Sequence, residues 1–458
     1  MPTEDLGRQA SKTIADGIGR RNLLRAAAAV SAAGAAAGLG APLAAEAATG
    51  ASRGGKGKGR DLEILQPHRG RIIGDHYLTS EPDEVLWGYV PALGSKPVLT
   101  MRSRETVTID TISHEGILED QGRDPVGYFR RQGVPRGQVL TDAVAVARDY
   151  DRTERDFDVD GPHVVTGPIF VEGARPGDVV KVETLAATPR VPYGVVSSRH
   201  GKGALPLTAD GTPAPGITRD EVMPPVGADG RGTGDPTKYG NVSIFTPVEQ
   251  HRGDLVGLME RTRGSVRFPL KPFMGMMGVA FAESTTPNAP QVNSIPPTLG
   301  GGNIDISLLG PGSTFYLPVR SEGALFYVGD PHLAMGDGEV ALTAMEGSLR
   351  ATFKLTVCRK GRGGAPAVAF DYPFAETKDS WIPIGLSDPD GSIGGQGSDL
   401  DIAMRRATVN ALDFLQGELG MDRAVAYAYL SAAADFVVSQ VVDRTVGVHG
   451  VIAKSHFV

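Results

Sequence analysis

Glycine and proline interrupt this sequence at short intervals from end to end. The 61 glycines and 33 prolines make up about a fifth of the 458 residues, above average usage, without a low-complexity run through the body of the chain. Such frequent turn-forming residues favour many short strands joined by tight turns and disfavour a protein of long helices. The length allows one large domain or two to three smaller ones. We therefore expect a mainly β protein.

Alternation of apolar and polar residues supports this expectation in three places. Residues 105–110 and 178–185 both place valine or isoleucine at every second position, as a half-buried strand does. The same alternation continues through 350–357 to the single cysteine, Cys358, which we interpret as a packing residue of a strand. A lone cysteine excludes an intramolecular disulfide and any multi-cysteine metal site.

Two segments lack this periodicity. Residues 191–245 are rich in Gly, Pro, Asp and Thr and predict a long surface loop of the kind that often covers a site. Residues 361–397 predict a second irregular segment.

The end of the chain changes to a helical pattern. Apolar residues recur every three or four positions from Leu400 to Leu415, behind a possible cap at Ser398 or Asp399. A second run, RAVAYAYLSAAADFVVSQVV, follows Asp422. The pattern predicts two C-terminal helices joined through Gly420.

The first 47 residues have the layout of an export signal. Arg20 and Arg21 precede an Ala/Gly-rich, weakly apolar stretch that ends in the small-x-small pattern Ala45-Glu46-Ala47, as in a twin-arginine signal peptide. Pro42 and the weak hydrophobicity argue against a transmembrane anchor. We expect residues 1–47 to direct export to the periplasm or outside the cell, without stable membrane insertion. Residues 48–60 read as a Gly-rich linker, and residues 61–458 as the catalytic domain.

The distribution of charged residues gives no indication of a nucleic-acid partner. The net charge is −7, and both signs are interspersed outside the N-terminal region, so no basic stripe indicates a nucleic-acid partner.

One stretch concentrates groups that can bind a metal ion or carry protons. GDPHLAMGDGEVALTAMEG, residues 329–347, mixes carboxylates and a histidine with glycines that permit tight turns and close approach to a ligand. Ordinary β-turns are the alternative interpretation. The apolar run 340–345 nevertheless leads into a carboxylate that should lie near buried surface, where an acid needs a partner, a proton or a metal. The candidates are Asp330, His332, Asp337, Glu339 and Glu346.

Three further stretches have the same character. TISHEGILEDQGRDP (111–125) follows a predicted strand, GPHVVTGPIFVEGARPGD covers 161–178, and PPTLGGGNIDISLLGPGSTFYLPV covers 296–319. Their candidate residues are His114, Glu115, Glu119, Asp120, Asp124, His163, Thr166, Glu172, Asn303 and Asp305.

Taken together, these stretches resemble the acetamidase/formamidase family of amide hydrolases. The resemblance also rests on SEPDEVLWG, KPFMGMMGVA, EGALFYVGDPHLAMGDGEVALTAMEG and the closing AYAYLSAAADFVVSQVVD, which occur in the family's order across roughly residues 70–455. It implies a jelly-roll-like β-sandwich with added C-terminal helices, a β-rich α+β fold. It also implies hydrolysis of small linear amides to a carboxylate and ammonia with a divalent metal ion, zinc being the first candidate. Met335 and Glu115 depart from the usual family pattern, in which a glutamine and a second histidine are common.

Three chemical routes to amide hydrolysis are open to such a chain. Cys358 is alone in a plain strand, and the glycine-rich GGGNID segment lacks the serine and lysine of a Ser-Ser-Lys amidase. A metal-activated water remains. Our hypothesis assigns His114 and His332 as ligands with Asp330 or Asp337, Glu339 or Glu346 as base, and Asn303 or a glycine amide as the oxyanion donor. Asp120, His163, Glu172 and Asp305 are further candidates.

Two other functions stay open at this point. One is hydrolysis of a different small amide or a carbamoyl compound, and the other is an exported binding protein without turnover. For the hydrolase we expect a small amide as the substrate, and we expect the protein to form a homo-oligomer.

Overall fold

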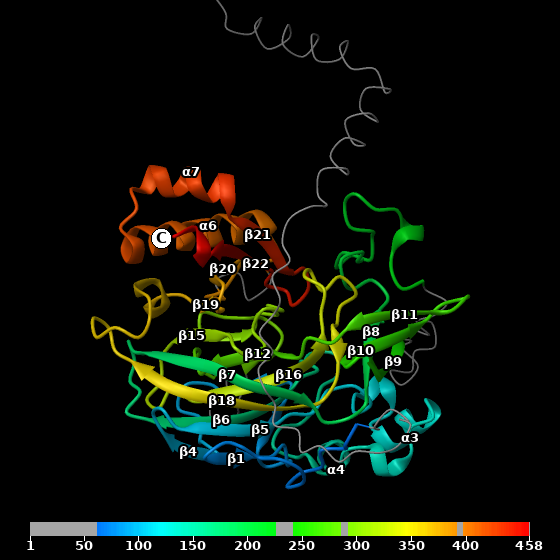
Figure 1. Ribbon diagram of the computed structural model, residues 1–458. Helices are drawn as coiled ribbons and strands as arrows, with labels where there is room; N and C mark the ends of the chain where they lie inside the picture. Colours follow the sequence, from blue (N-terminus) through cyan, green and yellow to red (C-terminus); the bar gives the residue numbers. More distant parts are fainter. Residues whose placement is uncertain (1–61, 226–240, 285–291, 392–396, 458) are drawn as a thin grey trace, which may run out of the picture. The chain divides into compact units, whose positions relative to one another are not determined.

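Two large sheets carry most of the chain in the computed structural model, which describes residues 62–225, 241–284, 292–391 and 397–457 (Figure 1). Neighbouring strands in both sheets run antiparallel, except that β1 pairs with β5, and β4 with β6, in parallel. In order across the sheet, the nine-stranded sheet consists of β1 (His76–Leu78), β5 (Thr106–Asp110), β18 (Leu349–Cys358), β7 (Val179–Pro189), β15 (Thr314–Pro318), β19 (Phe374–Glu376), β20 (Ser380–Leu386), β22 (Gly447–Ala453) and β21 (Asp435–Gln440).

The eleven-stranded sheet has a branch. Strand β16 pairs with β12 along one edge and with both β17 and β6 along the other, and β6 in turn pairs with β2 and β4. A separate two-stranded sheet joins β3 (Tyr89–Val90) to β13 (Val292–Asn293). The path of the large sheet is β11 (Ser265–Pro269), β10 (Asp254–Glu260), β9 (Asn241–His251), β8 (Tyr193–Arg199), β17 (Met345–Glu346), β16 (Phe326–Ala334), β12 (Phe273–Val279) and β14 (Gly301–Asn303), with β6 (Val164–Glu172), β2 (Val85–Trp87) and β4 (Leu99–Arg102) on the branch.

Apolar residues from both sheets form one core. Val107 and Phe353 of the nine-stranded sheet are fully buried in the same cluster as Met274 and Phe326 of the eleven-stranded sheet. The rings of Phe326 and Phe353 pack edge to face with centroids 6.0 Å apart. This arrangement confirms the mainly β prediction, while the jelly-roll connectivity stays a prediction. The predicted strands at 105–110, 178–185 and 350–358 are present as β5, β7 and β18.

The first C-terminal helix is confirmed at both ends. Helix α6 (Leu400–Leu419) begins behind Asp399, whose carboxylate accepts hydrogen bonds from the amides of Asp401 and Ile402, and it ends at Gly420 in the left-handed conformation. The helix lies against β20 and β22, where its small residues allow close approach (Figure 1). A Cβ on Gly385 of β20 would lie 2.1 Å from the carbonyl oxygen of Ala403.

The second C-terminal helix is shorter than predicted. Helix α7 (Arg423–Ala433) ends where the sequence turns to Phe, Val and Val, and β21 then pairs along β22. Branched and aromatic side chains fit a pleated strand better than a helix. The local sequence pattern permits either a longer helix or a strand after Ala433. Only the pairing with β22 shows that a strand forms.

The two predicted irregular segments were partly wrong. Strand β8 lies inside 191–245, and β19 and β20 lie inside 361–397, because strands buried on both faces lose the alternation that marks a strand. Helices α3 (Pro125–Arg131) and α4 (Thr141–Asp149) were not predicted. Short 3₁₀ turns cover Glu119–Gln121, Arg136–Gln138, Arg219–Glu221, Ala367–Phe370 and Lys454–His456.

The predicted leader and linker, residues 1–47 and 48–60, lie outside the described residues, so both stay predictions. Among the helices that the structure describes, none has the length and apolar character to cross a membrane.

Candidate metal centre

Strand β16 positions the centre of a buried cluster of histidine and carboxylate side chains. Asp330 and His332 stand two residues apart on this strand and so point to the same side. Glu346 of β17 is paired opposite His332, next to an irregularity in the ladder between His332 and Ala334. The Nε2 atom of His332 lies 3.0 Å from Asp330 Oδ2 and 3.1 Å from Glu346 Oε1.

Three other segments complete the cluster. The loop after β14 brings Asp305, whose Oδ1 lies 3.8 Å from His332 Nδ1, and the turn after β16 brings Glu339, whose Oε1 lies 3.9 Å from His332 Nε2. The segment after β5 brings His114, whose Nδ1 lies 3.9 Å from a carboxylate oxygen of both Asp330 and Glu346. These six residues, which we call the ligand cluster, are His114, Asp305, Asp330, His332, Glu339 and Glu346.

The backbone is held in unusual conformations to make this convergence possible. Asp305, Asp330 and Glu339 have φ values of 53°, 51° and 45°, in the left-handed region that non-glycine residues seldom occupy. Such conformations persist where the surrounding structure imposes them, and they concentrate at functional sites.

The donor atoms of the ligand cluster lack ordinary partners. All six residues are buried. Among the described residues, no hydrogen bond of normal geometry reaches the ring nitrogens of His114 and His332, the carboxylate oxygens of Asp305 or Oε2 of Glu346. Buried polar atoms are normally paired, so these atoms call for a ligand. Two triplets, His114–Asp330–Glu346 and Asp305–His332–Glu339, each bring one donor atom per residue within 4.8 Å of one another. Nitrogen and oxygen donors of this kind fit a divalent cation such as zinc.

The charges within the ligand cluster perturb its pKa values strongly. Burial, followed by the negative charge of Asp305, raises the pKa of Glu339 well above its ordinary value. Burial alone would lower the pKa of His332, but the charges of Glu346 and Asp330 raise it well above the ordinary value. Both shifts reflect buried groups surrounded by carboxylates, and a bound cation would offset the negative charge of those carboxylates.

Two further predicted residues stand at the edge of the ligand cluster. His163 of β6 has Nε2 3.7 Å from Asp330 Oδ1, while its Nδ1 lies 2.9 Å from the hydroxyl of Ser294. Burial lowers the pKa of His163 to about 4, so its ring is neutral at pH 7. Asn303, at the end of β14, is buried, and its Oδ1 has no hydrogen-bond partner among the residues described.

Three predicted candidates do not join the ligand cluster. Asp337 is exposed and accepts a hydrogen bond from the Ser307 hydroxyl at 2.8 Å. Glu172 is exposed at the end of β6, near Arg102. Asp120 is buried, but it accepts hydrogen bonds from the Arg199 guanidinium at 2.7 and 3.1 Å.

One acid of the site was not among the predicted residues. Asp443 follows β21 and has a φ of 63°, and its Oδ2 is a buried atom without a hydrogen-bond partner among the described residues. Burial, followed by the charge of Glu339, raises its pKa well above the ordinary value. Asp443 is the last residue of the motif AYAYLSAAADFVVSQVVD, which is the one sequence signal that could have identified it.

A cavity of about 930 Å³ opens onto the ligand cluster. Its lining includes His114, Asp330, Glu339 and Glu346 of the ligand cluster, together with Asn303, Arg155 and Arg199. A substrate that enters this cavity can therefore reach the ligand cluster directly.

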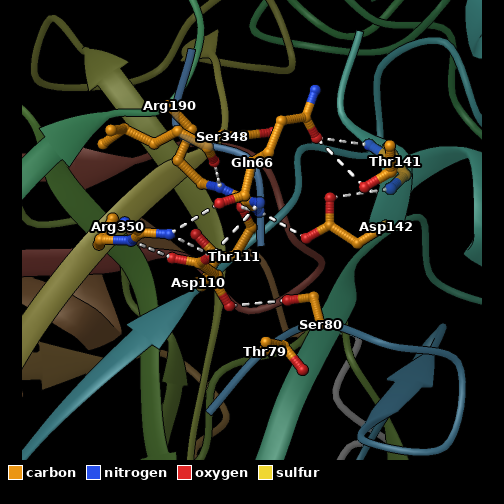
Figure 2. Close-up of polar contacts among 12 residues, drawn as sticks. Gln66, Thr79, Ser80, Asp110, Thr111, Thr141, Asp142, Arg190, Ser348 and Arg350 are labelled. Atoms are coloured by element: carbon orange, nitrogen blue, oxygen red, sulfur yellow. Dashed lines mark hydrogen bonds and ion pairs between the residues drawn. The ribbon is translucent and has the colours of Figure 1, made fainter. Parts of the chain in front are cut away.

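A buried network of charged residues anchors the strand that leads to His114 (Figure 2). Asp110, at the end of β5, accepts two hydrogen bonds from Arg350 at 2.6 and 2.8 Å. Arg190, which is fully buried, lies 3.3 Å from Asp110 Oδ2 and donates a hydrogen bond to Asp142 at 2.7 Å. Asp110 is thereby fixed four residues before the histidine.

Substituting Gly275 should disturb the ligand cluster directly. A Cβ at this position of β12 would lie 2.4 Å from Asp305 Oδ1, 2.6 Å from His332 Cε1 and 2.9 Å from Asp330 Oδ2. Since these three side chains cannot all keep their places, we expect Gly275→Ala to weaken zinc binding at least about 10-fold, as loss of ligand orientation typically does. Isothermal titration with zinc measures the effect. Gly312→Ala is the control, because no atom lies within 4 Å of its added Cβ, although its positive φ makes some loss of stability expected.

Sequence comparison relates the chain to known amidases. The sequence model of the Acetamidase/Formamidase family matches residues 271–452, which contain most of the ligand cluster. The formamidase of Methylophilus methylotrophus is 27% identical over 285 residues, which make up 57% of this chain and 69% of that protein. The acetamidase of Mycolicibacterium smegmatis is 29% identical over 222 residues, 44% of this chain and 54% of that protein.

Solved structures agree over a larger share of the chain. The crystal structure of an acetamidase from Yersinia enterocolitica superposes with a TM-score of 0.59 at 22% identity and covers 84% of this chain and 93% of its own. That of an acetamidase from Bacillus halodurans has a TM-score of 0.56 at 25% identity, with coverages of 83% and 98%. With the sequence motifs, the shared fold and the family match pointing the same way, the chain belongs to the acetamidase/formamidase family.

Proposed function

We propose that this protein hydrolyses the C–N bond of a small linear amide, giving a carboxylate and ammonia, with a divalent metal ion held in the ligand cluster. Membership of the family supports the coarser statement that the chain is an amidohydrolase acting on linear amides. The observation that carries the metal proposal is the set of buried histidine and carboxylate donors without partners, which faces a cavity.

The residues present fit such an ion. A divalent ion in this cluster would supply Lewis acidity, which polarises an amide carbonyl and makes water a nucleophile at neutral pH. Zinc is the first candidate because two imidazoles and several carboxylates suit it. The residues that could hold it are those of the two donor triplets, His114–Asp330–Glu346 and Asp305–His332–Glu339.

The neighbouring side chains supply the remaining requirements of amide hydrolysis. A carboxylate of the ligand cluster that lines the cavity and is not bound to the ion can take a proton from water and return it to the leaving nitrogen, and Glu339 is the first candidate. Glu346, which also lines the cavity, is the alternative proton carrier. Asn303 lines the cavity and can donate a hydrogen bond from its amide group to the oxygen that develops negative charge.

Metal removal provides the direct test of this proposal. Protein dialysed against a chelator is expected to lose ammonia release from amides, and stoichiometric zinc is expected to restore it. Magnesium, which suits an all-oxygen site, serves as the control ion. Full activity in protein shown by elemental analysis to be metal-free would refute the metal route. Binding of acetamide without ammonia release would instead favour a binding protein.

The assay should cover a series of acyl groups. The cavity of about 930 Å³ lies at the upper end of the range of roughly 300–1,000 Å³ typical for drug-sized ligands, far more than formamide or acetamide fills. We propose that primary amides with acyl groups larger than acetyl are hydrolysed with a higher kcat/KM than acetamide. A steady fall of kcat/KM from formamide upwards would show that the cavity does not serve the acyl group.

A further inference from the structure

Glu115 stands behind His114, on the side of the imidazole away from the ligand cluster. The Nδ1 atom of His114 faces the carboxylates of Asp330 and Glu346, at 3.9 Å from each. Its Nε2 atom faces the opposite way and lies 3.5 Å from Glu115 Oε1. Both side chains are buried, with 3% and 1% of their surfaces exposed. The ring therefore lies between the carboxylates of Asp330 and Glu346 on one side and that of Glu115 on the other.

The carboxylate of Glu115 is held in place by donors that do not contact the ligand cluster. The hydroxyl of Ser197 donates to Oε1 at 2.5 Å, and the amide of Gln121 donates to Oε2 at 2.6 Å. The hydroxyl of Tyr128 adds a longer bond to Oε2 at 3.3 Å. Hydrogen bonds of this kind stabilise the charged form of a buried acid and fix its orientation. Glu115 is therefore an oriented anion directed at one nitrogen of the histidine.

We propose that Glu115 is a positioning residue that keeps the ring proton of His114 on Nε2 and leaves the Nδ1 lone pair directed at the metal site. A neutral imidazole has one N–H and one lone pair. With the N–H on Nε2, the proton faces the Glu115 carboxylate, and the lone pair faces the position between Asp330 and Glu346. The other tautomer would direct a lone pair at an anion and a proton at the cation, so electrostatics disfavour it. This inference rests on the proposed metal site.

A positioning role accounts for a buried carboxylate that metal ligation alone leaves without a function. Glu115 belongs to neither donor triplet, and its oxygens are already bonded to Ser197, Gln121 and Tyr128. A carboxylate that orients a ligating histidine typically changes metal affinity or activity by about 10- to 100-fold when it is removed.

Zinc affinity and the His114 tautomer test the inference. Glu115→Gln keeps the shape of the side chain and removes its charge, so we expect the zinc Kd, measured by competition with a chelating dye, to rise about 10- to 100-fold. Glu115→Asp, which keeps the charge, is expected to recover part of this loss. Glu119→Gln is the matched control, because the carboxylate of Glu119 accepts its hydrogen bonds from Arg155, which is not part of the ligand cluster. Its zinc Kd should equal that of the wild type.

Nitrogen NMR of the zinc-loaded wild type, labelled with ¹⁵N-histidine, gives a readout that does not depend on how any variant folds. We expect the His114 proton on Nε2, and a proton on Nδ1 would overturn the inference. An unchanged zinc Kd in Glu115→Gln would overturn it as well, while leaving the metal site intact. A wild type that binds no zinc would instead refute the proposed function together with this inference.

Discussion

Replacing Glu339 with glutamine should separate the metal-binding function of the site from its effect on stability. We expect zinc affinity and the rate of ammonia release to fall at least about 100-fold, because loss of a ligand should exceed the 10- to 100-fold effect of residues that only orient ligands. The metal-free protein should be as stable as the wild type or more stable. Most substitutions at a buried charged residue lower stability, so loss of zinc binding without loss of stability would be a specific result.

The reason lies in the surroundings of Glu339. Its carboxyl group is buried, and burial followed by the charges of Asp305 and Asp330 raises its pKa well above the ordinary value. Folding therefore penalises the charged form when no cation is present. Glutamine has the same shape and no charge, so it removes that penalty. It also removes the negative charge that a cation requires.

Thermal unfolding with and without zinc measures both effects. In the wild type, zinc should raise the unfolding midpoint, since a ligand that binds only the folded state stabilises it. In Glu339→Gln this increase should largely disappear. Asp337→Asn is the matched control, because Asp337 lies two residues away, is exposed and is hydrogen-bonded to Ser307. Lost activity with an unchanged zinc Kd would show that Glu339 acts as a proton carrier and not as a ligand.

The contrast between Asp337 and Glu339 shows how far the sequence could predict the site. Both acids stand in one Gly-rich stretch, and a strand would direct them to the same face. The strand ends at Ala334, however, and the chain turns through Gly338 and Glu339 with φ values of 99° and 45°. Only Glu339 is turned inward. The sequence indicates that a turn lies there, but not which acid it directs inward.

Residues that reach the site through the pairing of strands could not be predicted from the local sequence. Asp443 reaches the ligand cluster because β21 pairs with β22 and places the following turn beside Glu339. The same strand pairing explains why the second helix was predicted too long. A residue whose position depends on a partner strand cannot be assigned from its own neighbours. By contrast, the strands at 105–110 and 178–185 were predictable because their alternation is local.

Removing the charge of Arg190 should cost more stability than any surface substitution. Arg190 has no exposed surface, donates hydrogen bonds to the carbonyl oxygens of Leu65 and Thr111, and contacts both Asp142 and Asp110 (Figure 2). Arg190→Leu would leave Asp142 buried without its cation, and breaking a buried pair in this way typically costs about 3–5 kcal/mol. Urea unfolding measures the loss. Arg148→Leu is the control, since its pair with Asp149 is exposed and should leave the unfolding midpoint unchanged.

A double substitution distinguishes an unpaired charge from lost packing. One cause of a lower free energy of unfolding in Arg190→Leu is that Asp142 is left as an unpaired buried charge. If this cause dominates, adding Asp142→Leu should recover most of the stability, since apolar residues can replace a buried ion pair without loss. Asp110 keeps its hydrogen bonds to Arg350 in both variants. Zinc affinity should not recover to the same extent, because the Arg190 contact with the Thr111 carbonyl, three residues before His114, is still missing. Recovery of stability together with full zinc affinity would show that the network supports the fold but does not position the histidine.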